Sequence, residues 1–288
     1  MIYLRLALLI ECFALPLRAE TLRVVTDIAP IHSLVSQIMQ GTNSVPQMLL
    51  TAQADPHDLA LRPSQAQMLQ DADLVIWIGA ALSPWMPAVL DMLAAQAKVM
   101  PLLQVNDTHL ILASEPLDSH DESEFDAIDP HAWLDPDNAA LWRTAIAETL
   151  VQLDPTYAAT YRANAEALTT PPDWDLSKLP PMLAEHDGLA YFAHHTGLRI
   201  EQTIHKPHDA TPSIRDIRDL QSSVEQKAIT CVLSDLGSDG RLLSTIFGAK
   251  GFSALPVVIL GDGQDLGPAY YNRLLTELAA AIQSCAKG

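Results

Sequence analysis

Leu74-Val75-Ile76-Trp77-Ile78-Gly79 decides the fold class, because it is a short and continuous apolar run that stops at a glycine. A run of this length without polar alternation is typical of a strand that is buried on both faces of a parallel sheet. Helical patterns flank it at about residues 63–72 and 84–96. Strands that alternate with helices predict an α/β fold with helices on both faces of a parallel sheet.

The same alternation continues outward from this stretch and falls into two halves. We expect strands at 22–26, 45–50, 74–78 and 99–103, and then at 182–184, 199–205, 229–233 and 256–260. Further helices are expected at 30–39, 187–196, 213–227, 241–247 and 268–285. We therefore predict a signal peptide at 1–19, an N-terminal α/β lobe at 20–135, a linking helical segment at 136–174 and a C-terminal α/β lobe at 175–288. Asp154-Pro155 is expected to break the linking segment.

The first 19 residues are typical of a secretory signal peptide. Arg5 precedes the apolar run 6–10, and Leu17-Arg18-Ala19 provides a cleavage point before Glu20. The apolar run is too short to span a bilayer. We therefore expect the mature chain to be exported, without a lipid anchor, since Glu11 before Cys12 does not fit a lipoprotein cleavage box.

Two cysteines, Cys231 and Cys285, remain after this cleavage. An even pair in an oxidising compartment favours a disulfide bond. The alternative is a pair of buried thiols.

The formal net charge of −18 restricts the partners of the chain. A strongly acidic surface argues against nucleic acid and against anionic lipid, whose phosphates it repels. It suits a protein that attracts cations, although solubility alone also explains it.

Three histidines and one aspartate, far apart in the sequence, form a candidate zinc site. They lie in Asp55-Pro56-His57-Asp58, Asp129-Pro130-His131, His186-Asp187-Gly188 and Leu260-Gly261-Asp262. Three imidazoles and one carboxylate complete a tetrahedral zinc shell. Ligands of open α/β sheets bind beyond the carboxyl ends of the strands, so loops of two lobes can meet there. The alternative third ligand is His194 or His195, because 189–193 resembles a strand more closely than the run before His186 does.

Several longer stretches point to one family. They are Val25-Thr26-Asp27-Ile28-Ala29-Pro30-Ile31-His32-Ser33-Leu34-Val35, Asp55-Pro56-His57-Asp58-Leu59-Ala60-Leu61-Arg62-Pro63-Ser64, Ala72-Asp73-Leu74-Val75-Ile76-Trp77-Ile78-Gly79, Asp129-Pro130-His131-Ala132-Trp133-Leu134-Asp135-Pro136-Asp137-Asn138-Ala139, and His186-Asp187 through Gly197-Leu198 to Pro212-Ser213. The chain resembles the periplasmic solute-binding proteins that deliver zinc or manganese to ABC importers, and specifically the high-affinity zinc-uptake branch. The resemblance covers essentially the whole mature chain.

This resemblance implies a fold, a site and a function. The fold is two parallel-sheet lobes joined by a long rigid backbone helix, with the metal in the cleft between the lobes. His57, His131 and His186 are implied as metal ligands, and His186 favours zinc because the manganese branch carries a glutamate there. The fourth metal ligand varies in the family between a carboxylate and water, and Asp262 stands where the family's aspartate falls. His32 is expected to pack near the site.

The implied function is periplasmic capture of Zn²⁺ and its delivery to the membrane permease of an ABC importer. A periplasmic metallochaperone that donates the metal is a further candidate partner, and we expect a monomer. The alternative is a manganese-binding or iron-binding protein of the same importer family. An adhesin on the same scaffold has no supporting segment.

The family's histidine-rich loop is poorly represented here, since 115–129 contains only His120. This acidic loop either helps to collect metal or is simply solvated. His109, His205 and His208 are expected at the surface.

A secreted zinc hydrolase is the competing class of function. It needs an open metal position and a general base. Asp58, Asp187 or Asp262 could supply the base, but the sequence has no H-E-x-x-H motif. We therefore do not expect an enzyme.

Overall fold

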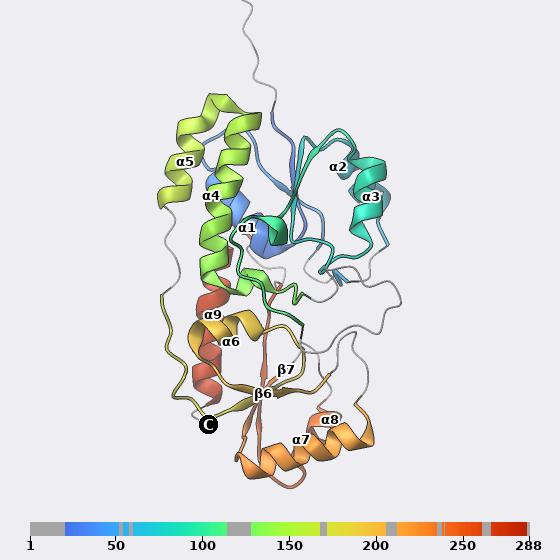
Figure 1. Ribbon diagram of the computed structural model, residues 1–288, viewed down its shortest axis with the longest axis vertical. Helices are drawn as coiled ribbons and strands as arrows, with labels where there is room; N and C mark the ends of the chain where they lie inside the picture. Colours follow the sequence, from blue (N-terminus) through green and yellow to red (C-terminus); the bar gives the residue numbers. More distant parts are fainter. Residues whose placement is uncertain are drawn as a thin grey trace, which may run out of the picture.

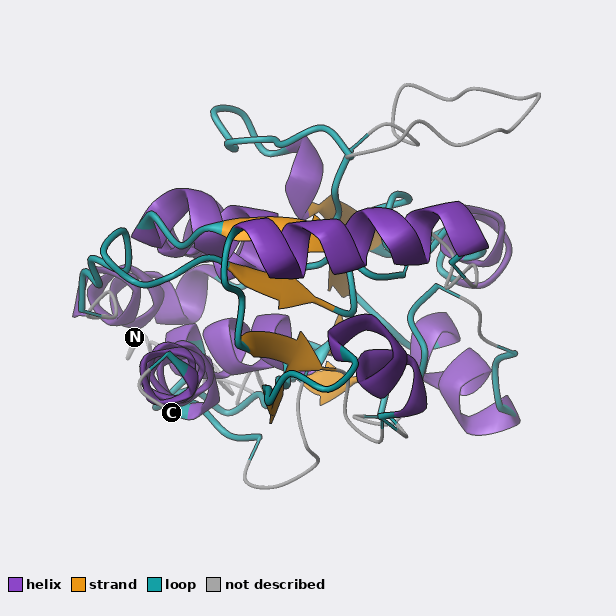
Figure 2. Cartoon of the chain, turned by 90° about the horizontal axis from the view of Figure 1, so that it is seen from below, coloured by secondary structure: helices purple, strands orange, loops and turns teal. Residues whose placement is uncertain are grey.

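The described part of the chain forms two parallel four-stranded sheets, each flanked by helices (Figure 1). The computed structural model describes residues 21–51, 54–57, 60–113, 128–167, 172–205, 212–234, 238, 240–260 and 266–286. The predicted signal peptide lies outside the described residues. Seen from below, the strands lie inside a shell of helices (Figure 2).

The first sheet has the strand order β2-β1-β3-β4, with every neighbouring pair parallel. Its central strand β3 is buried along its whole length, as the apolar run predicts. The helices α2 and α3 lie on one side of this sheet and α1 lies on the other (Figure 1). The elements are β1 (Val24–Thr26), α1 (Ala29–Ile38), β2 (Gln47–Met48), α2 (Pro63–Gln70), β3 (Leu74–Trp77), α3 (Met86–Leu93), β4 (Lys98–Pro101) and the 3₁₀ turn η1 (Leu102–Gln104).

The second sheet repeats this plan with the order β6-β5-β7-β8, again parallel throughout. The helices α7 and α8 pack together below it (Figure 1). The elements are β5 (Met182–Ala184), α6 (Ala190–Thr196), β6 (Ile200–Thr203), α7 (Ile214–Gln226), β7 (Cys231–Ser234), α8 (Arg241–Phe247), β8 (Ser253–Pro256) and α9 (Tyr270–Cys285). Two of the predicted helix ends are confirmed in detail, because Ser213 and Asp216 form a capping box and Gly197 ends α6 with φ +71°.

The segment between the sheets is a helical hairpin. Helix α4 (Pro136–Leu153) is followed by the 3₁₀ turn η3 (Pro155–Tyr157) and by α5 (Ala158–Ala167), which packs back against α4 (Figure 1). The predicted break at Asp154-Pro155 is confirmed, and the Asp154 side chain accepts a hydrogen bond from the Thr156 N–H. The described residues of this segment form two helices, so the expected single long helix joining the lobes is not confirmed.

Contacts with helix α9 and a shared core tie the two halves together. Ser33 of α1 donates to the carbonyl oxygens of Gly267 and Pro268, each at 3.0 Å, just before α9. The Tyr271 hydroxyl donates to the Trp133 carbonyl oxygen at 2.8 Å. One hydrophobic cluster runs from strands β1 and β3 through α4 to α9. The first and second sheets therefore share a continuous core.

One strand assignment from the sequence is wrong. The strand expected at 256–260 is β8 at Ser253–Pro256, an edge strand whose residues alternate between half-buried and exposed, so an apolar run is not its signature. The helix expected at 187–196 is confirmed as α6, although residues 189–193 resemble a strand by composition. None of the described helices is long and apolar enough to cross a membrane.

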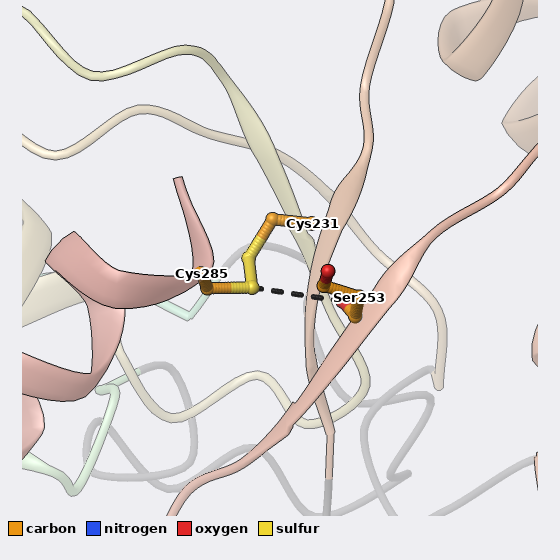
Figure 3. The surroundings of a disulfide bond; sticks show 3 residues. All are labelled: Cys231, Ser253 and Cys285. Carbon is orange, nitrogen blue, oxygen red and sulfur yellow. Dashed lines mark hydrogen bonds between the residues drawn. A yellow bond between two sulfur atoms is a disulfide. The ribbon is translucent and has the colours of Figure 1, made fainter. Parts of the chain in front are cut away.

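The disulfide bond between Cys231 and Cys285 is present (Figure 3). It joins the first residue of β7 to the last turn of α9, with a Cα–Cα distance of 5.8 Å. The covalent link therefore holds α9 against the second sheet at the amino ends of its strands.

Candidate metal centre

The structure brings His57, His131 and His186 together from three separate loops. One ring nitrogen of each lies within 4.8 Å of the others. His57 lies between β2 and α2, His131 precedes the 3₁₀ turn η2 (Ala132–Leu134), and His186 follows β5 by two residues. Asp262, the predicted fourth residue, lies outside the described residues.

The closest pair of nitrogens has the spacing of two ligands on one ion. The Nε2 atoms of His131 and His186 are 3.2 Å apart. Two nitrogens that each lie 2.0–2.1 Å from a tetrahedral zinc ion are separated by about 3.3 Å. Two unprotonated ring nitrogens at this distance repel one another unless a proton or a metal cation lies between them.

A buried carboxylate orients His131. Its Nδ1 lies 2.7 Å from Asp129 Oδ1, and its backbone N–H donates to the same oxygen at 2.9 Å. The Asp129 carbonyl oxygen in turn accepts a hydrogen bond from the Tyr191 hydroxyl at 3.0 Å. A carboxylate on one ring nitrogen fixes the tautomer and leaves the other nitrogen, Nε2, with a lone pair for a metal.

The loop that bears His57 is anchored through its neighbour, Pro56. The Pro56 carbonyl oxygen accepts hydrogen bonds from Ser83 Oγ at 2.9 Å and from Trp85 Nε1 at 2.8 Å. Asp55 Oδ1 accepts from the His57 N–H at 2.8 Å. These contacts hold the loop against the segment that follows β3, so the carboxyl end of the first sheet positions His57.

The backbone at Gly188 passes close to the histidines. A β-carbon there would lie 2.7 Å from His186 Cδ2 and 3.1 Å from His131 Nε2. It would also lie 3.0 Å from Ile259 Cδ1, in the segment that follows β8. Only glycine leaves room for the two imidazoles in this arrangement.

A tryptophan joins the two halves beside the site. The Trp133 ring is fully buried, and its centroid lies 5.1 Å from that of His131. Its Nε1 donates to the Ile259 carbonyl oxygen at 2.9 Å. The loop after β8, which leads to Asp262, is thereby fixed next to His131.

The other histidines considered from the sequence lie elsewhere or outside the described residues. His194 and His195, the alternatives to His186, gather around Asp135 with His109 and not around His131. His32 is half-buried, and its Nδ1 lies 3.3 Å from Thr26 Oγ1. Burial lowers the pKa of His32. The His109 side chain is 40% exposed but contacts Asp135, a role that the surface assignment missed. Asp58, His120 and His208 lie outside the described residues.

Known proteins resemble this chain along nearly its whole length. The profile of the family described as zinc-uptake complex component A, periplasmic, matches residues 24–285. The high-affinity zinc uptake system protein ZnuA of Paracoccus denitrificans is 33% identical, and the match covers 94% of each chain. The manganese-binding lipoprotein MntA of Halalkalibacterium halodurans is 29% identical, but only over 51% of this chain and 45% of its own.

The fold has counterparts among solved structures. A crystal structure of ZnuA superposes with a TM-score of 0.73 at 20% identity, covering 93% of this chain and all of the other. At that identity the likeness concerns the fold, and it agrees with the two-sheet α/β architecture. The profile match across both sheets shows that the chain belongs to the family of periplasmic zinc-uptake complex component A proteins.

Proposed function

We propose that this protein captures Zn²⁺ in the periplasm on His57, His131 and His186 and delivers it to the permease of an ABC importer. The convergence of the three imidazoles, with Asp129 orienting one of them, is the observation that carries the proposal. The family is a solute-binding component of importers and not an enzyme. Zn²⁺ is therefore cargo that must be both held and released.

The ligand chemistry favours zinc over manganese. Imidazole nitrogens are ligands of intermediate softness, and three of them suit zinc. Manganese prefers a shell rich in oxygen ligands. The manganese-binding relative matches only half of the chain, while the zinc-uptake relative matches nearly all of it. The manganese or iron alternative is therefore the weaker one.

We assign the fourth position to Asp262. Ile259 lies beside Gly188, at the edge of the histidine group. The three residues that follow Ile259 can span about 10 Å when extended, which is enough for the Asp262 carboxylate to reach the three histidines. Water or another carboxylate is the alternative at this position.

The remaining proposals concern location and partners. Residues 1–19 act as a signal peptide that sends the chain to the periplasm, in agreement with its family. Membership in the family of zinc-uptake complex components also supports a membrane permease as the partner. The division into lobes at 20–135 and 175–288, the monomeric state and donation of zinc by a metallochaperone are proposed on the sequence evidence.

Metal titration of the mature chain tests the function. The chain from residue 20 is stripped with a chelator and titrated with Zn²⁺ and with Mn²⁺ by calorimetry, as wild type, His186→Ala and Asp262→Ala. Tight zinc binding that is largely lost in His186→Ala is expected, with little binding of manganese. His195→Ala is the matched control because it alters the rejected third ligand. Tight zinc binding that survives His186→Ala but is lost in His195→Ala would overturn the assigned site.

A further inference from the structure

A second group of histidines and aspartates lines a pocket on the other side of η2. The pocket has a volume of about 620 Å³. Within it the structure contains two sets of three side chains that offer ligand atoms within 4.8 Å of one another. The sets share Asp135 and are His109, Asp135, His194 and Asp135, Asp137, His195.

The set of His109, Asp135 and His194 has the geometry of a three-ligand site. His109 Nδ1 lies 3.0 Å from Asp135 Oδ2. The ring centroids of His109 and His194 are 4.6 Å apart, with a tilt of 49° between the planes. Two imidazoles and one carboxylate at this spacing suit zinc, which accepts three protein ligands with water in the fourth position.

Asp135 is a buried carboxylate whose neighbours are the histidines His109 and His195 and the exposed carboxylate of Asp137. Its side chain is 5% exposed, and Oδ1 accepts the Asp137 N–H at 2.9 Å, as the N-cap of α4. Its other contacts are His109 on one oxygen and His195 Nδ1, at 3.5 Å, on the other. No lysine or arginine forms an ion pair with it in the part of the chain that the structure describes. A cation held beside this buried carboxylate would further stabilise its charge, and a metal bound by the neighbouring imidazoles would supply that cation.

The backbone around His109 is held in place by a buried amide. The His109 N–H donates to Asn138 Oδ1 at 2.8 Å, and Asn138 Nδ2 donates to the His109 carbonyl oxygen at 2.9 Å. Asn138 is 1% exposed and lies one turn beyond Asp135 on α4. The carboxylate and the imidazole are thereby fixed relative to one another before any ion arrives, which lowers the entropic cost of binding.

We propose that His109, Asp135 and His194 form a second binding site for a first-row divalent cation of the zinc class. His195 and Asp137, on the other oxygen of Asp135, add nitrogen and negative charge beside it. The net charge of −18 raises the local concentration of cations. The site shares no residue with the group of His57, His131 and His186, so it stands whether or not that group carries the proposed function.

The second site would join the two halves of the molecule. His109 follows η1 of the first half and Asp135 begins α4, whereas His194 lies in the last turn of α6. Tyr191, also on α6, places its ring 6.0 Å from that of His109 and donates to the Asp129 carbonyl oxygen at 3.0 Å. An ion held by Asp135 and His194 fixes α6 against the start of α4, and by mass action it stabilises the folded chain.

Zinc stoichiometry in the full mature chain tests this site. Competition with a chromophoric chelator measures the bound equivalents in wild type, in His57→Ala/His186→Ala and in His109→Ala/His194→Ala. We expect two equivalents in wild type, one weaker equivalent in the first variant and one tight equivalent in the second. His205→Ala, a histidine of the second half that belongs to neither group, should keep both.

A second measurement removes any ambiguity from misfolding. In His57→Ala/His186→Ala, added Zn²⁺ should shift the imidazole NMR signals of His109 and His194 and raise the melting temperature. The proposal is overturned if that variant binds no zinc. The proposal is also overturned if that variant binds zinc without a shift of the His109 and His194 signals, or if His109→Ala/His194→Ala retains both equivalents of zinc.

Discussion

His131 Nδ1 lies 2.7 Å from Asp129 Oδ1, in a pair whose side chains are 5% and 6% exposed. The carboxylate fixes the imidazole so that Nε2 faces His186 Nε2 at 3.2 Å. Such a pair does more than orient a ring, because a carboxylate hydrogen-bonded to Nδ1 raises the basicity of the nitrogen that faces the metal.

Asp129→Asn should therefore weaken zinc binding by about 10-fold to 100-fold, the usual cost of losing such a carboxylate. The amide can still accept the His131 N–H, so the fold should persist while the negative charge is lost. Competition with a chromophoric chelator measures the affinity, and far-UV circular dichroism checks the fold.

Asp55→Asn is the matched control, because Asp55-Pro56-His57 repeats the Asp129-Pro130-His131 motif. Asp55 accepts the backbone N–H of His57 at 2.8 Å, a contact that asparagine reproduces. A much smaller loss of affinity is expected. Equal losses in the two variants would argue against the proposed role of the Asp129–His131 pair.

Gly188→Ala should lower zinc affinity by at least about 10-fold while costing about 1–3 kcal/mol of stability, as overpacking does. The new methyl group would lie 2.7 Å from His186 Cδ2 and 3.1 Å from His131 Nε2, so the two imidazoles must move apart. Gly251→Ala is the control, since a β-carbon there meets nothing within 4 Å. Calorimetry that gives the two variants the same zinc affinity would contradict this prediction.

Periodicity predicted the buried strands well because burial on both faces leaves an unmistakable apolar run. The strand expected at 74–78 is β3 at Leu74–Trp77, and the strand expected at 229–233 is β7 at Cys231–Ser234. The edge strand β8 was misplaced because an edge is only half covered, and the more apolar segment at 257–260 instead forms the loop beside the site. Local pattern therefore identifies central strands better than edges.

The grouping of the three histidines could be predicted because each lies in a distinctive motif, and two of them, His57 and His186, lie at strand-to-helix loops. The second group could not, since its members are an N-cap aspartate, a loop histidine and two histidines at a helix end, where cations are common anyway. Only the packing of α6 against η2 and the amino end of α4 brings His194 to Asp135. The hint available from the sequence was His194-His195 itself, which was considered for the wrong site.

Removing the disulfide by Cys231→Ser/Cys285→Ser should lower the free energy of unfolding by about 2–4 kcal/mol. The two cysteines are separated by 54 positions in the sequence. For a loop of this length the chain-entropy model gives a stabilisation of about 4 kcal/mol. Cys231 begins β7, whereas His186 follows the end of the neighbouring parallel strand β5, so the bond and the site lie at opposite ends of the strands. Zinc affinity should therefore be unchanged. Urea unfolding curves measure the stability, and a large loss of zinc affinity in the folded variant would contradict the expected independence.

The stability of the metal-free protein should fall as the pH rises from about 4 to about 7, in part because of Asp27. Burial raises the pKa of Asp27 to about 7 from its ordinary value of 3.8. This effect outweighs the hydrogen bonds from the backbone N–H groups of Ile78 and Ile28, which lower the pKa. These donors lie 2.7 Å and 2.8 Å from the carboxylate. The folded state thus holds a proton that the unfolded state has released. The contribution is complete below pH 4, declines by at most about 1.4 kcal/mol per pH unit, and is lost above pH 7.

Asp27→Asn isolates this contribution because an amide does not ionise. The variant loses one of two backbone acceptors, a cost of about 1–3 kcal/mol that does not depend on pH. Its free energy of unfolding should therefore rise relative to wild type between pH 4 and pH 7, measured by urea denaturation in the presence of a chelator. Asp91→Asn, which alters an exposed aspartate on α3, is the control for the general effect of removing a carboxylate. If wild type and Asp27→Asn show parallel pH profiles, then the Asp27 carboxylate stays ionised in the fold, held by its two N–H donors.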